Sequence, residues 1–142
     1  REVMPNHCTN EVYISFKDQG TTKEFLEFVK GKDERGYEVP FTFNAIKPLP
    51  DGKWDYDWCV ENWGTKWDAY KYSTARDEVE VDVEDDLIVT IEFLTAWGPP
   101  QPILKKINEK FGDKINYCRW FYRDEADMFC GYLDVDVGMN DE

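Results

Sequence analysis

The chain has 142 residues, of which 42% are hydrophobic and 16% aromatic, so it has the length of one domain and too many aromatic residues for a disordered chain. Its formal net charge of -13 at pH 7 argues against binding to nucleic acid or to anionic membranes, because both repel polyanions. No apolar run approaches the ~20 residues that a membrane-spanning helix needs.

The first elements in chain order are a strand and a helix. Hydrophobic residues alternate along 9–16, which predicts a strand. Thr21 and Glu24 have the pattern of a capping box, which predicts a helix that starts there and ends near Gly31. The stretch 32–40 is polar and is expected to be a loop.

Residues 41–72 are expected to form an insert rich in tryptophan. The segment PLPDG at 48–52 breaks regular structure, and a short helix is predicted over 56–62, with Gly64 at its end. Trp63 and Trp67 are four positions apart, a spacing that would place both on one helix face.

The second half of the chain predicts a hairpin, a helix and two more strands. Valines alternate with acidic residues over 77–84, Asp85 and Asp86 form a turn, and the chain returns as a strand over 87–95. Prolines between 99 and 102 open a helix that Gly112 ends, and strands are predicted over 115–122 and 128–137.

This order predicts an α+β fold, a two-layer ferredoxin-like sandwich whose largely antiparallel sheet carries two helices on one face. The final strand and the tryptophan-rich insert would be additions to that core. All of 1–142 is expected to be a single domain, and Met4 predicts that residues 1–3 are not native.

Short segments along the chain resemble a known family. They are MPNHCTN at 4–10, FNAIKPLP at 43–50, NWGTKWDA at 62–69 and TAWGPP at 95–100. They are similar to the YubB ferredoxin-like domain family, the phage Api-type proteins, a domain of unknown function. The resemblance implies a ferredoxin-like fold, carriage by a phage or plasmid and a place in the cytoplasm of a bacterial host. It brings no catalytic residue with it.

The sequence predicts no metal site, no cofactor and no enzymatic activity. Cys8, Cys59, Cys118 and Cys130 are too widely spaced for a C-x-x-C site, and free thiols in a reducing cytoplasm are expected. His7 is the one histidine, and the chain lacks the short motifs of hydrolases, P-loop proteins and zinc proteases.

A run of acidic residues is the first candidate site. On a strand, alternate acids project from one face at steps of ~6.6–6.8 Å, which is comparable to the spacing of several Å between DNA phosphates. The run either binds a partner or is a solvated face that keeps the protein dissolved. It lacks the glycine of a calcium-binding loop. The residues of this partner-binding site are Asp77, Glu78, Glu80, Asp82, Glu84, Asp85 and Asp86.

The insert provides an alternative site. If its tryptophans are exposed, they could stack on a ligand or peptide while Lys66 contacts an anionic group, and if they are buried, they hold the insert on the sheet. The residues of this alternative are Trp63, Lys66, Trp67 and Trp97.

The sequence therefore favours a non-enzymatic, cytoplasmic accessory protein of a phage or plasmid. We expect it to bind a host protein through its acidic face, as a nucleic-acid mimic in counter-defence, without direct contact to nucleic acid or membrane. A ligand- or peptide-binding module is the alternative.

Overall fold

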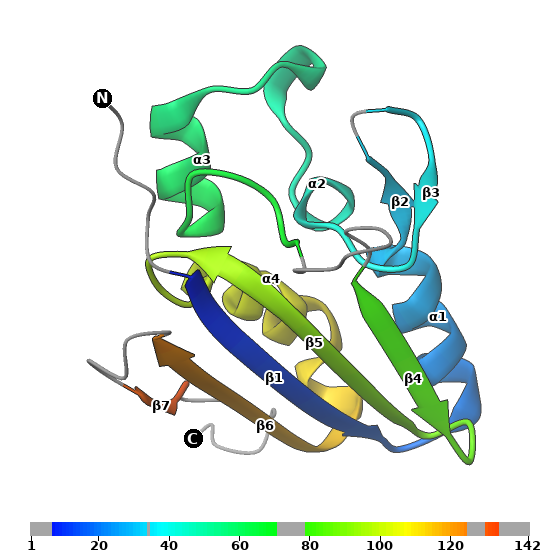
Figure 1. Ribbon diagram of the computed structural model, residues 1–142. Helices are drawn as coiled ribbons and strands as arrows, with labels where there is room; N and C mark the ends of the chain where they lie inside the picture. Colours follow the sequence, from blue (N-terminus) through cyan, green and yellow to red (C-terminus); the bar gives the residue numbers. More distant parts are fainter. Residues whose placement is uncertain (1–6, 34, 71–78, 125–129, 134–142) are drawn as a thin grey trace.

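The computed structural model describes residues 7–33, 35–70, 79–124 and 130–133, and its frame is a five-stranded antiparallel sheet (Figure 1). The sheet has the order β4-β5-β1-β6-β7. Its strands are β1 (His7–Phe16), β4 (Glu80–Glu84), β5 (Ile88–Ala96), β6 (Ile115–Asp124) and β7 (Cys130–Tyr132). β1 is central, since it pairs Val12 with Ile91 on one side and with Trp120 on the other.

Two long helices, α1 (Gln19–Val29) and α4 (Gln101–Phe111), cover one face of this sheet (Figure 1). Phe16 of β1 packs against Phe25 of α1, and the ring of Phe25 lies 5.5 Å from that of Phe111 at the end of α4. Burying each such side chain contributes about 1.5–3 kcal/mol. The predicted ferredoxin-like sandwich is therefore confirmed, with β7 as an added strand.

Among the described residues, every helix is too short or too polar to cross a bilayer.

The start of α1 differs from the prediction. Asp18, and not Thr21, is the N-cap, because its carboxylate accepts hydrogen bonds from the Thr21 amide at 2.7 Å and from the Thr21 hydroxyl at 3.0 Å. Thr21 is buried inside the first turn. The capping-box prediction is wrong because a carboxylate one turn earlier already uses the threonine hydroxyl as a donor.

The predicted hairpin of β4 and β5 is confirmed. Asp85 and Asp86 have φ values of 54° and 56°, which is the backbone of a two-residue turn that follows the twist of its strands. The predicted strand over 77–84 appears as β4, and its first two residues, Asp77 and Glu78, lie outside the described residues. Of the predicted strand over 128–137, the structure describes β7.

The insert lies beyond one end of the sheet (Figure 1). The stretch expected to be a loop contains a small hairpin of β2 (Gly31–Lys32) and β3 (Glu38–Val39). The helices α2 (Phe43–Ile46) and α3 (Tyr56–Trp63) follow, with a turn of 3-10 helix, η1 (Pro50–Gly52), between them. A second such turn, η2 (Gly112–Lys114), links α4 to β6.

The Asp68 carboxylate ties the two ends of the insert together. It accepts hydrogen bonds from the amides of Phe43 at 2.6 Å, Asn44 at 3.1 Å and Ala69 at 2.7 Å, and from the Thr42 hydroxyl at 2.5 Å. Burial raises the pKa of this carboxyl, and the four hydrogen bonds oppose that rise. The segment 62–69 is thus fastened to the N-terminus of α2, where unpaired amides need acceptors.

Candidate functional site

The sheet face that α1 and α4 leave uncovered is called the open face below, and it faces the viewer in Figure 1. Successive side chains of a strand point to opposite faces, so the partners of one row across paired strands share a face. Val12, Ile91 and Trp120 form a row that points into the core. The neighbouring rows therefore point outward onto the open face.

One outward row brings three glutamates together. Glu11 of β1 lies opposite Glu92 of β5, and Glu92 lies opposite Glu80 of β4. All three side chains are exposed. Neighbouring strands are ~4.8 Å apart, and like charges directly opposite each other destabilise a sheet. The fold therefore sets the like charges of Glu11 and Glu92 directly opposite each other, an arrangement that opposes the pairing of β1 with β5.

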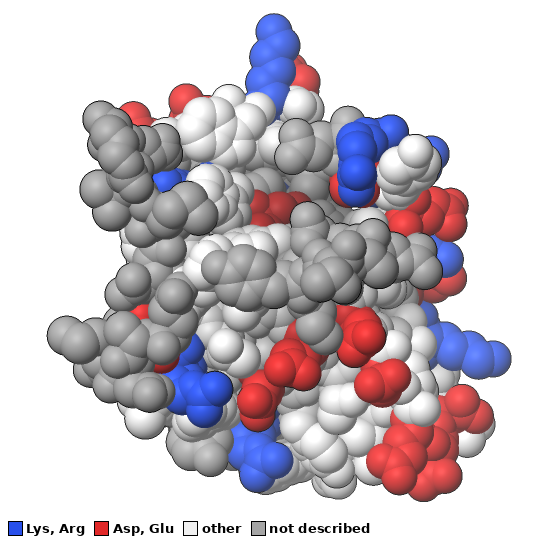
Figure 2. Space-filling view, in the orientation of Figure 1, with Lys and Arg blue, Asp and Glu red and all other residues white. Residues whose placement is uncertain are grey.

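The acidic residues that the sequence predicted as a partner-binding site lie next to this row. Asp82 and Glu84 follow Glu80 along β4 on the open face, and Asp85 and Asp86 stand in the exposed turn beyond them. Figure 2 shows acidic side chains gathered over β4 and the adjoining strands, and basic side chains toward β6. Sequence reasoning missed Glu11 and Glu92, because only the pairing of β1 with β5 brings them together.

A shallow hollow of about 450 Å³ lies over these rows on the open face. Its walls combine the three glutamates of the row and Asp82 with Tyr13 and Arg119. The Arg119 guanidinium lies 5.8 Å from the centre of the Tyr13 ring, which also meets Tyr117 edge to face. The hollow thus combines acidic side chains from β1, β4 and β5 with the Tyr13 ring of β1 and the Arg119 guanidinium of β6. The described residues include no group of three or more His, Cys, Asp and Glu side chains placed to hold a metal ion.

The tryptophans do not form one platform. Trp63 is 2% exposed, donates its indole N–H to the Lys47 carbonyl at 2.9 Å and packs edge to face on Phe43 and Trp58. It belongs to the core that holds the insert, so it is not a residue of an exposed ligand site. α3 ends at Trp63, so the helix face that Trp63 was expected to share with Trp67 does not exist.

The other three residues of the alternative site do come together. The Lys66 ammonium lies 4.6 Å from the centre of the Trp67 ring and 4.6 Å from that of Trp97. The Trp54 indole N–H donates to the Lys66 carbonyl at 2.7 Å. We call Lys66, Trp67 and Trp97 the lysine clamp. Trp97 follows β5 directly and has a φ of 73°.

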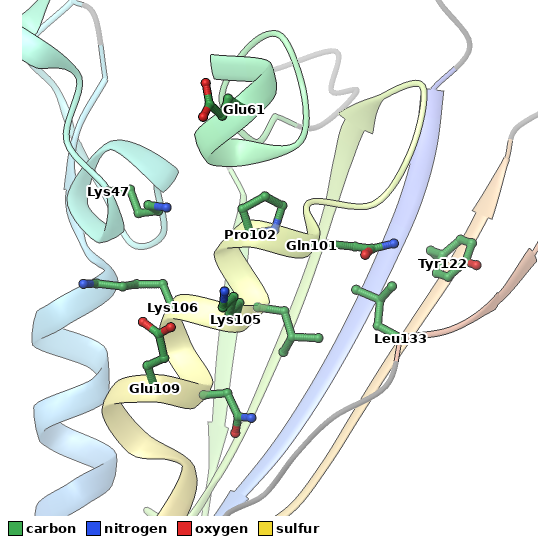
Figure 3. Close-up of a pocket in the computed structure, with 11 residues that line it drawn as sticks. Lys47, Glu61, Gln101, Pro102, Lys105, Lys106, Glu109, Tyr122 and Leu133 are labelled. Carbon is green, nitrogen blue, oxygen red and sulfur yellow. The ribbon is translucent and has the colours of Figure 1, made fainter. Parts of the chain in front are cut away.

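A second hollow, of about 830 Å³, lies on the helix side of the molecule (Figure 3). It runs along α4 and is lined by lysines as well as acids, so its charge is mixed, unlike that of the acidic row. Asn108 contributes a buried side-chain oxygen that accepts no hydrogen bond from the described residues. The charged residues of its wall are Lys47, Lys105, Lys106, Glu61 and Glu109.

A comparison with known protein families identifies the family of this chain. The family model described as a ferredoxin-like domain in Api92-like protein matches residues 53–140, more than half of the chain, and the chain belongs to this family. The match agrees with the resemblance to Api-type proteins. It includes β4 to β7 and leaves out β1 and α1. No curated protein and no solved structure matches the chain.

Proposed function

We propose that this member of the ferredoxin-like domain family of Api92-like proteins is a binding protein whose open face takes up a strongly basic protein surface. The observation that carries the proposal is the row of Glu11, Glu92 and Glu80 across three paired strands. A partner that brings arginine or lysine side chains to this row places positive charges beside its three carboxylates.

Electrostatic interactions favour a basic partner surface over a neutral or acidic one. Basic groups of the partner attract the carboxylates of the row, and they also offset the repulsion between Glu11 and Glu92, which lie directly opposite each other. The net charge of -13 adds attraction at long range and speeds encounter with basic partners. The adjoining Tyr13 and Tyr117 rings offer flat contact area beside the charges, and arginine stacks well on such rings.

A surface with these properties suits a partner that otherwise holds nucleic acid. Glu80, Asp82 and Glu84 repeat at ~6.6–6.8 Å along β4, and the row across the strands repeats at ~4.8 Å. A groove built for phosphates at spacings of several Å would meet carboxylates at similar spacings. In our proposal the protein acts without chemistry of its own, as a nucleic-acid mimic carried by a phage or plasmid in the cytoplasm of a bacterial host.

The test uses octa-arginine as a minimal basic partner and follows backbone amide shifts of the full chain by NMR. We expect shifts in β1, β4 and β5 on the open face. The double variant Glu11→Gln and Glu92→Gln should weaken binding roughly five- to tenfold, as expected for two partly exposed charge contacts.

A matched control separates this site from net charge alone. Glu61→Gln with Glu109→Gln removes the same two charges from the wall of the other hollow, on the helix side. We expect the control to bind octa-arginine almost as the wild type does. Equal weakening in both double variants would mean that overall charge, and not the open face, binds the peptide, and it would refute the proposal.

A further inference from the structure

The lysine clamp holds a cation between two exposed rings. Trp67 and Trp97 are 36% and 46% exposed, and the Lys66 ammonium lies 4.6 Å from both ring centres. This is within the ~6 Å over which the negative face of an aromatic ring attracts a cation. Among the described residues, no carboxylate forms an ion pair with Lys66. The two rings therefore both attract its ammonium.

The backbone of Trp97 is strained to place its ring there. Trp97 has a φ of 73°, and the Gly98 amide donates to the Ala96 carbonyl at 2.9 Å, so Trp97 stands at the centre of a tight three-residue turn. A bulky residue with positive φ is an outlier, and such outliers gather at ligand sites. The Thr95 hydroxyl donates to the Gly98 carbonyl at 2.6 Å and fixes the turn.

The rest of the clamp is held independently of the Lys66 side chain. Trp54 bonds to the Lys66 carbonyl, which anchors the backbone and leaves the side chain free to swing away. The Trp67 ring packs edge to face on Tyr70, with 6.1 Å between the ring centres. Both walls of the clamp would thus remain in place if the lysine side chain left.

We infer that Trp67 and Trp97 form a binding site for an alkylammonium group that bears N-methyl groups, and that the Lys66 side chain fills this site when no ligand is bound. The faces of the rings select a cation, and the charge of -13 repels anions. N-methylation weakens hydration of an ammonium and increases its contact with the rings, so a methylated group displaces the primary ammonium of Lys66. The inference does not depend on the open face.

The first experiment measures binding of choline to the full chain from the shifts of the tryptophan indole N–H signals, at constant ionic strength. Lys66→Ala removes the side chain from the site, so we expect choline to bind roughly five- to thirtyfold more tightly, the factor that two exposed cation–π contacts represent. Lys53→Ala is the matched control, because it removes the same charge from a lysine of the insert that takes no part in the clamp. It should leave the affinity unchanged.

Two further measurements test the chemistry of the site. The neutral isostere of choline, 3,3-dimethylbutanol, should bind much more weakly than choline, and Trp97→Leu and Trp67→Leu should each lose choline binding while keeping the thermal unfolding transition. Unchanged or weaker binding of choline to Lys66→Ala would overturn the inference, because a lysine that contacts the ligand, or only braces the rings, gives that result. Equal binding of the isostere would also overturn it.

The source of the alkylammonium group is distinguished by one more comparison. A tripeptide with trimethyllysine between two glycines presents the same cation on a peptide backbone. Tighter binding of the tripeptide than of choline would assign the site to methylated lysines of proteins, whereas tighter binding of choline would assign it to small quaternary amines.

Discussion

Replacing Asp68 tests whether a single carboxylate holds the two ends of the insert together. In Asp68→Ala, the amides of Phe43 and Ala69 lose their acceptor, while the Asn44 amide keeps a second one in the Thr42 hydroxyl at 3.2 Å. Phe43 is fully buried, so water cannot replace the lost bond, whereas Ala69 is half-buried and can be rehydrated.

The expected loss follows from these contacts. A buried amide left without a partner costs about 1–3 kcal/mol, and removal of an N-cap acceptor costs ~1 kcal/mol. We therefore expect Asp68→Ala to lower the free energy of unfolding by about 2–4 kcal/mol. Asp68→Asn should lie between the alanine variant and the wild type, because its amide oxygen still accepts the bonds of Phe43 and Ala69.

Urea unfolding followed by tryptophan fluorescence measures these differences. Asp33→Ala is the control, since Asp33 also accepts hydrogen bonds from two backbone amides, those of Arg35 and Tyr37, but in an exposed turn where water can take its place. A loss in Asp68→Ala no larger than that in Asp33→Ala would refute the reasoning, because burial of the donors would then make no difference.

Three further predictions follow from single side chains. Trp97→Gly should be ~1 kcal/mol more stable than Trp97→Ala in urea unfolding, because only glycine accepts positive φ without strain, and the reverse order would contradict the strained turn. The hydrogen bonds from Thr21 lower the pKa of the Asp18 carboxyl in the folded protein. The ionised Asp18 therefore stabilises the fold above the pKa of ~3.9 that it has in the unfolded chain, and this stabilisation is lost as pH falls through its lower pKa in the folded protein. Urea midpoints of Asp18→Asn should therefore fall less between about pH 5 and pH 2 than those of the wild type, and parallel curves would refute this. Exposed Cys130 should react first with iodoacetamide, whereas buried Cys8, whose pKa is raised by burial to about 11, should react only on unfolding. Peptide mapping by mass spectrometry measures the two rates, and equal rates would contradict this prediction.

The sequence predicted the elements of the fold better than their ends. Alternation of Val12, Ile14 and Phe16 marked β1, and the pair Asp85 and Asp86 marked the tight turn after β4. The start of α1 was misplaced because Asp18 and Thr21 both have cap chemistry, and only the folded backbone decides which one accepts. The β2–β3 hairpin was missed because its strands are two residues long and show no periodicity.

The candidate sites depended on information that a single sequence does not contain. Glu11 and Glu92 could each be predicted to point away from the core, but their meeting follows from the register of two strands far apart in the chain. Trp63 and Trp67 have the same residue type and a helical spacing, yet one is core and the other surface, because Gly64 ends the helix between them. The lysine clamp needs Trp97, which a distant turn supplies.

The position of β1 in the sheet has a consequence for how the chain folds during synthesis. β1 comes off the ribosome first among the strands, yet both of its partners, β5 and β6, belong to the second half of the chain. Contacts of such long sequence separation form slowly, and unpaired strands are exposed meanwhile. Most of the chain must therefore be made before the sheet can close, and a fragment that begins at residue 53, like the segment that matches the family, would leave β5 and β6 without the strand that joins them.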